Sequence, residues 1–252
     1  MSYRRICAAL IVVFGVSAVL HSGGTSATAP LFRDVRTIAR GLRNPEGVAV
    51  DTRTGIAYVT DTKNHQLKII QPNGAVSILA GSGVPGLRDG DGQSAQFKAP
   101  RGLVLDAAQN VLYVADSANH AIRRVSLTGT VTTLAGSGRP GLKDGRGGAA
   151  ELKEPGGIAI DGSGAIYVAD TKNNVIRRVT TDGTVTTFAG TGRDGFADGA
   201  AHAARFAEPE AIAASPAGVL YIADTRNHRV RKIENGIVST IAGSGQAGTG
   251  TD

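Results

Sequence analysis

The sequence predicts an all-β fold built from four consecutive antiparallel sheets, and three sets of repeated residues predict it. Four prolines each open an apolar segment, at spacings of 55, 55 and 54 residues: Pro45, Pro100, Pro155 and Pro209. Four aspartates each end a second apolar segment, at spacings of 55, 54 and 54 residues: Asp61, Asp116, Asp170 and Asp224. A third segment, Val-Thr-Thr-Leu-Ala-Gly at 131–136, recurs in the same register. Repetition at this period favours a β-propeller, in which each four-stranded unit forms one blade.

Each unit contains four short strand-like segments in the same order. In the second unit they read Gly-Leu-Val-Leu-Asp, Leu-Tyr-Val-Ala-Asp, Ile-Arg-Arg-Val and Val-Thr-Thr-Leu-Ala. Turn residues such as those at 161–164 and 182–183 separate them and favour the tight turns of antiparallel pairs. A four-stranded sheet has two apolar faces that it cannot cover alone. We therefore expect each sheet to pack against its neighbours in the chain.

Composition excludes several classes of protein. Glycine makes up 35 of 252 residues without a three-residue period, which excludes collagen. The hydrophobic share of 41% is too high for a disordered chain. The single cysteine excludes a disulfide scaffold and a cysteine-ligated zinc cluster.

The N-terminus has the pattern of a secretory signal peptide, which we place at residues 1–29. Arg4 and Arg5 precede an apolar run at 6–20 that is short for a membrane span, and small polar residues follow it. An uncleaved anchor is the alternative. We expect a secreted or periplasmic protein with no membrane span in the mature chain. Without Arg4 and Arg5, that chain has 25 basic and 21 acidic residues, a net charge of +4.

The repeated unit resembles a known family. Residues 113–125, Tyr-Val-Ala-Asp-Ser-Ala-Asn-His-Ala-Ile-Arg-Arg-Val, are similar to the NHL repeat, named for its Asn-His-Leu core. That core takes the form Asn-His at 64–65, 119–120 and 227–228, and Asn-Asn at 173–174. The resemblance covers residues 43–245. It implies a propeller, usually of six blades.

We divide the propeller, residues 30–252, into repeats at about 43–98, 99–153, 154–207 and 208–252. Four repeats are few for this family, and the last ten residues resemble the start of an inter-blade segment. We therefore interpret the sequence as truncated at its C-terminus, with about two blades missing from a six-bladed ring. A closed four-bladed ring is the alternative. Residues 35–41 resemble a fourth strand that could close the ring.

One aspartate and one asparagine recur in each of the four units, eight residues in all, and we interpret them as structural. An aspartate at the end of a strand can accept backbone N–H groups in the following turn, where asparagine is also favoured. Basic residues lie seven positions later, at Lys68, Arg123, Arg177 and Arg231, and could pair with it. A catalytic site is the alternative, but it needs asymmetry that a repeated motif lacks. The eight residues are Asp61, Asn64, Asp116, Asn119, Asp170, Asn173, Asp224 and Asn227.

We assign no catalytic residue, metal or cofactor. Equivalent histidines at His65, His120 and His228 would be spread apart by the ring, and His202 is expected at the surface. The family includes zinc- and calcium-dependent lyases, so a divalent metal, Ca or Zn, is the alternative. Asp89 and Asp91 suggest calcium only weakly, because the other units have one aspartate there.

The three glycine-rich segments between units, which we call the inserts, are the most individual feature. They span 81–99, 136–154 and 190–208. Each contains Asp-Gly and a later apolar residue, Phe97, Leu152 or Phe206. We expect this residue to pack against a blade and so to anchor the insert. Loops on one rim of a rigid scaffold commonly form a binding face. The ligand-binding residues expected there are Arg88, Asp89, Lys143, Asp144, Arg193 and Asp198.

These observations predict an exported, non-catalytic and monomeric scaffold that binds a protein, peptide or glycan. The alternative is a metal-dependent lyase or lactonase-like hydrolase with its site in the propeller channel. Nucleic-acid binding through the Arg-Arg pairs is disfavoured by the modest charge and by the absence of tryptophan.

Overall fold

The computed structural model describes residues 37–248, which form four antiparallel sheets in chain order. Sheet 1 contains β1 (Pro45–Asp51), β2 (Ile56–Asp61), β3 (Gln66–Ile70) and β4 (Val76–Ala80). Sheet 2 contains β6 (Pro100–Asp106), β7 (Val111–Asp116), β8 (Ala121–Ser126) and β9 (Thr130–Ala135). Sheet 3 contains β11 (Ile158–Ile160), β12 (Ile166–Asp170), β13 (Val175–Val179) and β14 (Thr184–Ala189). Sheet 4 contains β16 (Pro209–Ala214), β17 (Leu220–Asp224), β18 (Arg229–Glu234) and β19 (Ile237–Ala242). The predicted signal peptide lies outside the described residues.

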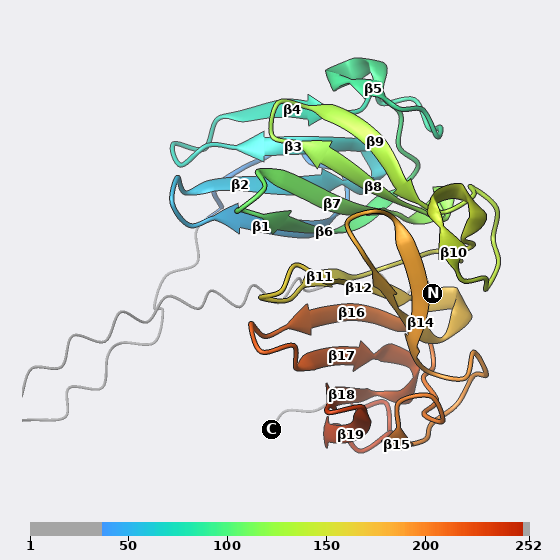
Figure 1. Cartoon of the computed structure of the whole chain (residues 1–252). Helices are drawn as coiled ribbons and strands as arrows, with labels where there is room; N and C mark the ends of the chain where they lie inside the picture. Colours follow the sequence, from blue (N-terminus) through green and yellow to red (C-terminus); the bar gives the residue numbers. More distant parts are fainter. Residues whose placement is uncertain (1–36, 249–252) are drawn as a thin grey trace, which may run out of the picture.

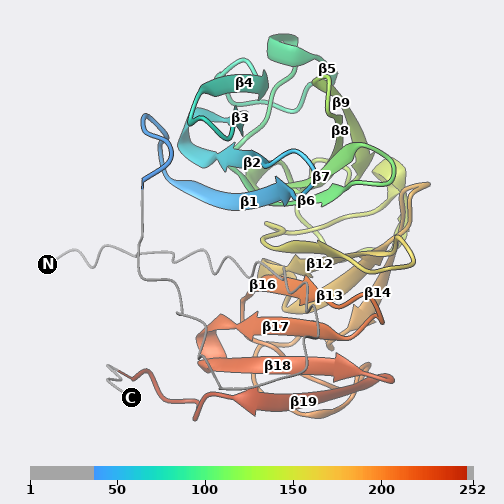
Figure 2. The same ribbon diagram turned by 90° about the vertical axis from the view of Figure 1, so that its left-hand side faces the viewer.

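The sheets are arranged as the blades of a propeller. Strands β1, β6, β11 and β16 lie next to one another in that order, and Figure 1 shows them in the middle with β4 and β19 at the far ends. Figure 2 shows the same succession from the side, with sheet 1 and sheet 4 at opposite ends of an arc. The all-β propeller of four-stranded blades predicted from the repeats is therefore confirmed.

Sheets 2, 3 and 4 each gain a fifth, two-residue strand that the repeat pattern did not predict. These strands are β5 (Gly90–Asp91), β10 (Gly145–Arg146) and β15 (Gly199–Ala200). Each comes from the preceding insert and pairs with the outermost strand, β9, β14 or β19. The added strand covers an edge that would otherwise expose unpaired backbone groups. Two residues are too few to carry an alternating pattern, which is why the sequence did not reveal it.

The core lies between neighbouring sheets, as the repeated apolar segments predicted. Tyr113 and Ile122 of sheet 2 belong to one buried cluster with Ile158 and Val168 of sheet 3. Similar clusters join sheet 1 to sheet 2 and sheet 3 to sheet 4. The apolar residues expected to anchor the inserts are fully buried in these clusters: Phe97, Leu152 and Phe206.

The innermost strands approach so closely that one of the contacting positions must be glycine. The N–H of Gly102 donates to the carbonyl of Gly156 over 3.0 Å, which links sheets 2 and 3 through their backbones. A Cβ at Gly102 would lie 2.5 Å from that same oxygen. Small residues at the start of the first strand therefore let the sheets converge.

The segment preceding sheet 1 differs from expectation. Of the residues 35–41 that resembled a fourth strand, the described part, 37–41, has no strand structure. Ala39 and Leu42 instead pack against Ala57, Val59 and Ile70 on the outer face of sheet 1. The segment covers an apolar face through side-chain contacts and pairs with no strand there. Within residues 37–248, no helix has the length and apolarity to cross a membrane.

Candidate functional site

A short 3-10 turn follows the second strand of each sheet, on the face that carries the inserts. The four turns are η1 (Thr62–Asn64), η3 (Ser117–Asn119), η5 (Thr171–Asn173) and η6 (Thr225–Asn227). The residue after each turn has a left-handed backbone, with φ between 50° and 55°, and it is His65, His120, Asn174 or His228. This face, which we call the insert face, also holds the first residues of the innermost strands.

The repeated aspartate is the centre of a buried network. In sheet 2, Asp116 Oδ1 accepts the backbone N–H of Lys98 over 2.8 Å. Its Oδ2 accepts from Asn119 Nδ2 and from Arg123, each over 2.8 Å. The backbone donor thus comes from the chain that enters the sheet, 18 residues earlier, and not from the following turn as the sequence suggested. One carboxylate therefore fixes the insert's end, the turn and the third strand together.

The arginine of this network reaches outward to a second aspartate, on the insert. Arg123 is fully buried and bonds Asp89 Oδ1 over 2.7 Å as well as Asp116. It also donates to the carbonyls of Gln96 and Arg88. Asp89 in turn accepts from the N–H and hydroxyl of Thr133 on β9. The insert is thereby fastened to the sheet that follows it.

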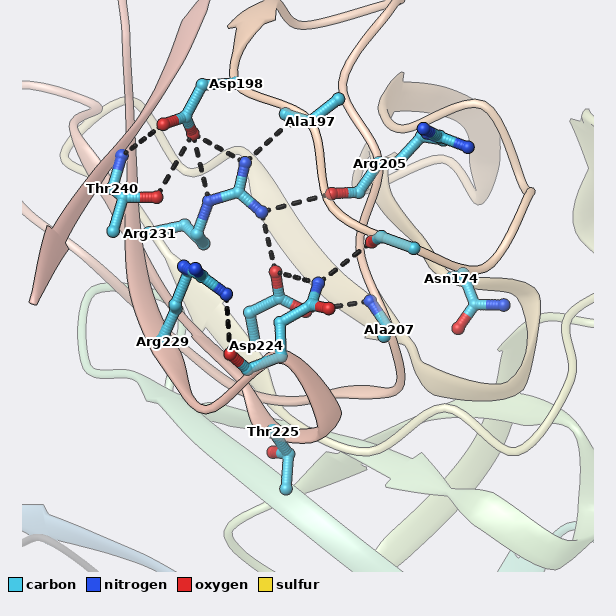
Figure 3. A network of polar contacts seen from close by, with 12 residues as sticks. Asn174, Ala197, Asp198, Arg205, Ala207, Asp224, Thr225, Arg229, Arg231 and Thr240 are labelled. Carbon is cyan, nitrogen blue, oxygen red and sulfur yellow. Dashed lines mark hydrogen bonds and ion pairs between the residues drawn. The ribbon is translucent and has the colours of Figure 1, made fainter. Parts of the chain in front are cut away.

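The same network recurs in sheets 3 and 4. Arg177 joins Asp170 to Asp144, which also binds Thr187. Figure 3 shows the copy in sheet 4, where Arg231 lies between Asp224 and Asp198 and donates to the carbonyls of Ala197 and Arg205. In sheet 1, Asp61 accepts from Asn64 and from the N–H of Arg43, and Lys68 stands at the position of the arginine.

Burial and hydrogen bonding act in opposite directions on these carboxylates. Burial raises the pKa of Asp116 and Asp170 above the ordinary value, while hydrogen bonds from asparagine, backbone and arginine oppose it. At the more open Asp89, burial also raises the pKa, but the hydrogen bonds from Thr133 and Arg123 hold it below its usual range. The outer carboxylate is thus kept charged, and its oxygens are already occupied.

The sequence-predicted ligand residues divide into two groups. Asp89, Asp144 and Asp198 point their carboxylates at arginines inside the network. Arg88 and Lys143 contribute their backbone carbonyls to it, and their side chains are exposed. Arg193 is also exposed. Within residues 37–248 the side chains of these three basic residues form no ion pair.

Sequence reasoning missed a row of exposed apolar side chains on the inserts. Leu87, Leu142 and Phe196 are 41%, 47% and 40% exposed. Each lies two positions before the insert aspartate, so the three are equivalent. The signal was a large apolar residue at the same place in three glycine-rich loops. We call these residues the tip row.

A second group of charges lies where the innermost strands begin. Arg101 of sheet 2 pairs with Glu46 of sheet 1 over 3.2 Å. Glu208, directly before β16, pairs with Lys172 of η5 over 2.9 Å and with Arg226 of η6 over 3.2 Å. Unlike the buried network, these pairs differ from sheet to sheet.

Two of the repeated histidines accept a hydrogen bond from the backbone that leads into the next sheet. His65 Nδ1 accepts the N–H of Ala99 over 3.0 Å, and His120 Nδ1 accepts that of Glu154 over 3.1 Å. Asn174 does the same for Glu208 with its side-chain oxygen, over 2.8 Å. His202, expected at the surface, is exposed. No three His, Cys, Asp or Glu side chains converge on a metal position among residues 37–248.

Comparison with known proteins places these features among related repeats. Residues 42–70 and 206–233 match the family described as NHL repeat, and residues 91–193 match the SMP-30/Gluconolactonase/LRE-like region. These matches fall on sheets 1 to 4 and on the inserts between them.

Curated relatives share the repeats over much longer chains. Human NHL repeat-containing protein 2 is 28% identical over 229 residues, which cover 79% of this chain and 31% of the relative. Protein SUPPRESSOR OF QUENCHING 1, chloroplastic, of Arabidopsis thaliana is 34% identical over 145 residues, which cover 54% of this chain and 14% of the relative. The chain thus spans less than a third of either protein.

Among solved structures, an auxiliary nutrient binding protein from Bacteroides ovatus is similar to this chain. The TM-score is 0.61 at 24% identity, and the match covers 80% of this chain and 49% of that structure. At this level of identity the likeness shows the fold alone.

Proposed function

We propose that this chain, a member of the NHL-repeat β-propeller family, is a non-catalytic scaffold that binds a protein, peptide or glycan through its three inserts. One observation carries the proposal. The repeated charged residues are used internally to lock each insert to a sheet, while basic and apolar side chains at the insert tips are exposed. Loops held on a rigid base bind with little loss of conformational entropy.

The proposal is tested by probing the purified chain on peptide and glycan arrays. We expect binding that is lost in the triple variant R88A/K143A/R193A and kept in R53A/R124A/K232A, which changes three basic residues outside the inserts. The first three side chains are exposed and unpaired, so the fold of that variant should be unchanged by circular dichroism. Binding to neither array, or binding equal in both variants, would refute the proposal.

We further propose that the protein is exported after removal of residues 1–29. The proposal rests on the basic, apolar and small-residue pattern of that segment. Expression of the full chain followed by N-terminal sequencing of the mature product tests it. A product that begins between residues 22 and 30 in the periplasm or medium supports export, and an unprocessed product in the cytoplasm contradicts it.

A second function has one observation in its favour, the match of residues 91–193 to the SMP-30/Gluconolactonase/LRE-like region. A hydrolase of this kind would use the charged groups at the start of the innermost strands, where Glu208 lies between Lys172 and Arg226. Lactone hydrolysis by the purified chain, lost in E208Q, would favour this function over the binding scaffold. Absence of turnover with divalent metals added would count against it.

A further inference from the structure

The face of sheet 4 that points away from sheet 3 is apolar and exposed. The neighbours of Tyr221 in β17 pack toward sheet 3, so Tyr221 itself points the other way. Val230 shares that face, because it lies opposite Ala223, two residues after Tyr221. Val230 and Ile241, on the next two strands, are 37% and 50% exposed. We call these residues the sheet 4 end face: Tyr221, Val230 and Ile241.

The other three sheets bury the residues equivalent to this face against the sheet that follows them. In sheet 3, the ring of Phe188 stands at 69° to that of Tyr167, with their centres 5.0 Å apart, and both rings lie against sheet 4. In sheet 1, the equivalent residues lie in the cluster shared with sheet 2: Tyr58, Leu67 and Leu79. In sheet 2 they lie in the cluster shared with sheet 3: Tyr113, Ile122 and Leu134. These three interfaces show what fits the sheet 4 end face, namely the outer face of another such sheet.

The outer face of sheet 1 is uncovered in the complementary way. Val76 is 39% exposed, whereas its equivalents in the other sheets are at most 1% exposed because they pack on the preceding sheet: Val131, Val185 and Val238. Val50 on the same sheet is also exposed. Pro45, which opens β1, is exposed too, while the equivalent prolines are buried: Pro100, Pro155 and Pro209. We call Val50 and Val76 the sheet 1 end face.

Two polar groups beside the sheet 4 end face lack the partner that their equivalents have in the next sheet. Thr62 and Thr171 donate their hydroxyls to the carbonyls of the prolines that open the next sheet, Pro100 and Pro209, over 2.7 and 2.8 Å. The equivalent Thr225 is exposed, and within residues 37–248 its hydroxyl donates only to a carbonyl of its own sheet.

The second group is the imidazole of His228. The residues at its position in sheets 1 to 3 each accept a backbone N–H from the residue before the next sheet's proline. Among the described residues, His228 accepts none and is exposed. Asn44 directly precedes Pro45 and has φ 55°, close to the left-handed values of the residues that donate at the other junctions. Asn44 and Pro45 therefore carry the N–H and the carbonyl that His228 and Thr225 lack.

We propose that a second copy of this chain docks head-to-tail, with its sheet 1 end face covering the sheet 4 end face. The contact would repeat the sheet-to-sheet contact that the chain already makes three times, with Asn44 and Pro45 of one copy bonded to His228 and Thr225 of the other. Exposed apolar patches of this kind mark protein–protein contact sites. The two faces differ, so the contact is heterologous. This inference goes beyond the proposed scaffold function and does not depend on it.

Residues 38–39 occupy part of the place that this docking needs. A Cβ at Gly74 would lie 2.9 Å from the carbonyl oxygen of Ile38, and one at the equivalent Gly129 would lie 2.6 Å from that of Leu79 on β4. Ile38 thus stands where the fourth strand of a preceding sheet would stand, and Ala39 packs on sheet 1 beside it. The incoming β19 must displace this segment. Little apolar contact is lost, because Ile38 is already 65% exposed.

Sedimentation velocity of the full chain over a wide range of concentrations tests the proposal. We expect self-association in the wild-type chain and at least a tenfold loss of affinity in V230D/I241D and in V50D/V76D. An equimolar mixture of the two variants should form a complex of one copy of each, because one intact face of each kind remains. Complex formation also shows that both variants are folded. The matched control L87D/L142D, which changes similarly exposed residues on the inserts, should associate like the wild-type chain.

A wild-type chain that stays monomeric at every concentration would overturn the proposal, including the case in which residues outside 37–248 of the same chain cover the sheet 4 end face. Undiminished self-association of either variant alone would also overturn it, because it would indicate a contact between like faces. So would a mixture that forms no complex. Ala39→Asp should strengthen association at least threefold by weakening the hold of residues 38–39 on sheet 1. Unchanged or weaker association in that variant would refute the competition.

Discussion

Among individual residues, the buried arginines carry the largest structural role. Arg123, Arg177 and Arg231 have fully buried side chains and each joins two aspartates from different parts of the chain. Arginine suits this position because its planar group offers donors in several fixed directions. In sheet 2 the N–H donors of Arg123 reach two carboxylates and two carbonyls at once. Lysine, as found at Lys68 in sheet 1, could not satisfy all four.

We expect Arg123→Ala to be strongly destabilising, because it leaves Asp116 buried without its charged partner. Removal of one partner from a buried pair costs about 3–5 kcal/mol. The neighbouring Arg124 is partly exposed and outside the network, so Arg124→Ala should cost less than about 1 kcal/mol. Urea unfolding followed by circular dichroism measures both. Equal stabilities of the two variants would show that the network does not hold the insert in place.

At the level of elements, the junction between sheets depends on the residue that follows each 3-10 turn. His65 and His120 use Nδ1 to accept a backbone N–H from the segment that leads into the next sheet, and Asn174 does so with an amide oxygen. A protonated imidazole has no free lone pair for that bond. The junction at His120 is therefore sensitive to pH, and the junction at Asn174 is not.

The sign of this pH dependence follows from the surroundings of His120. Burial lowers its pKa, Lys98 and Lys153 lower it further, and Glu154 acts in the opposite direction. A histidine whose pKa is lowered by folding binds fewer protons when folded. Its stabilising contribution is therefore complete above the unfolded value of about 6.5 and declines as pH falls through it.

Amide hydrogen exchange at pH 7.5 and pH 5.5, expressed as protection factors, tests this prediction. The N–H group of Glu154 should lose protection at the lower pH, while that of Glu208 should not. The variant H120N should abolish the difference, and N174H should introduce it at Glu208. Equal changes at both amides in the wild-type chain would contradict the assignment.

For the whole molecule, stability comes from sheets packed face to face. Residues at equivalent positions of different sheets are therefore buried to different extents. Tyr113 of sheet 2 is 1% exposed because sheet 3 covers it, and Tyr167 of sheet 3 is 6% exposed under sheet 4. The equivalent Tyr221 of sheet 4 is 41% exposed. The contribution of this tyrosine to stability therefore depends on whether a neighbouring sheet covers it.

We expect Tyr113→Ala to cost about 3–5 kcal/mol, the usual range for loss of a buried aromatic side chain. Tyr221→Ala should cost about 1 kcal/mol or less, as expected for an exposed position. Thermal unfolding and urea unfolding of the two purified variants give the comparison. Similar costs at both positions would mean that stability does not depend on packing between sheets.

The sequence was informative about the frame and less so about the surface. Repeated prolines, aspartates and strand segments predicted the sheets, their order and the burial between them, because every copy obeys the same packing requirement. The partners of Asp116 were partly missed, since the backbone N–H of Lys98 comes from a loop whose path no pattern encodes. The free charge of Arg88 and the exposure of Leu87 depend on which neighbouring groups are already occupied, and only the structure shows that.

We propose that repeated residues build the frame of this chain and that the insert tips bind its ligand. The most direct test is an alanine scan of residues 81–99 and 136–154, in which the melting temperature and the binding to the peptide and glycan arrays are measured for each variant. Alanine at Asp89, Phe97, Asp144 or Leu152 should lower the melting temperature, whereas alanine at Leu87, Arg88, Leu142 or Lys143 should weaken binding at an unchanged melting temperature. Variants of the first set that lose binding at an unchanged melting temperature, or variants of the second set that bind as well as the wild-type chain, would contradict the proposal.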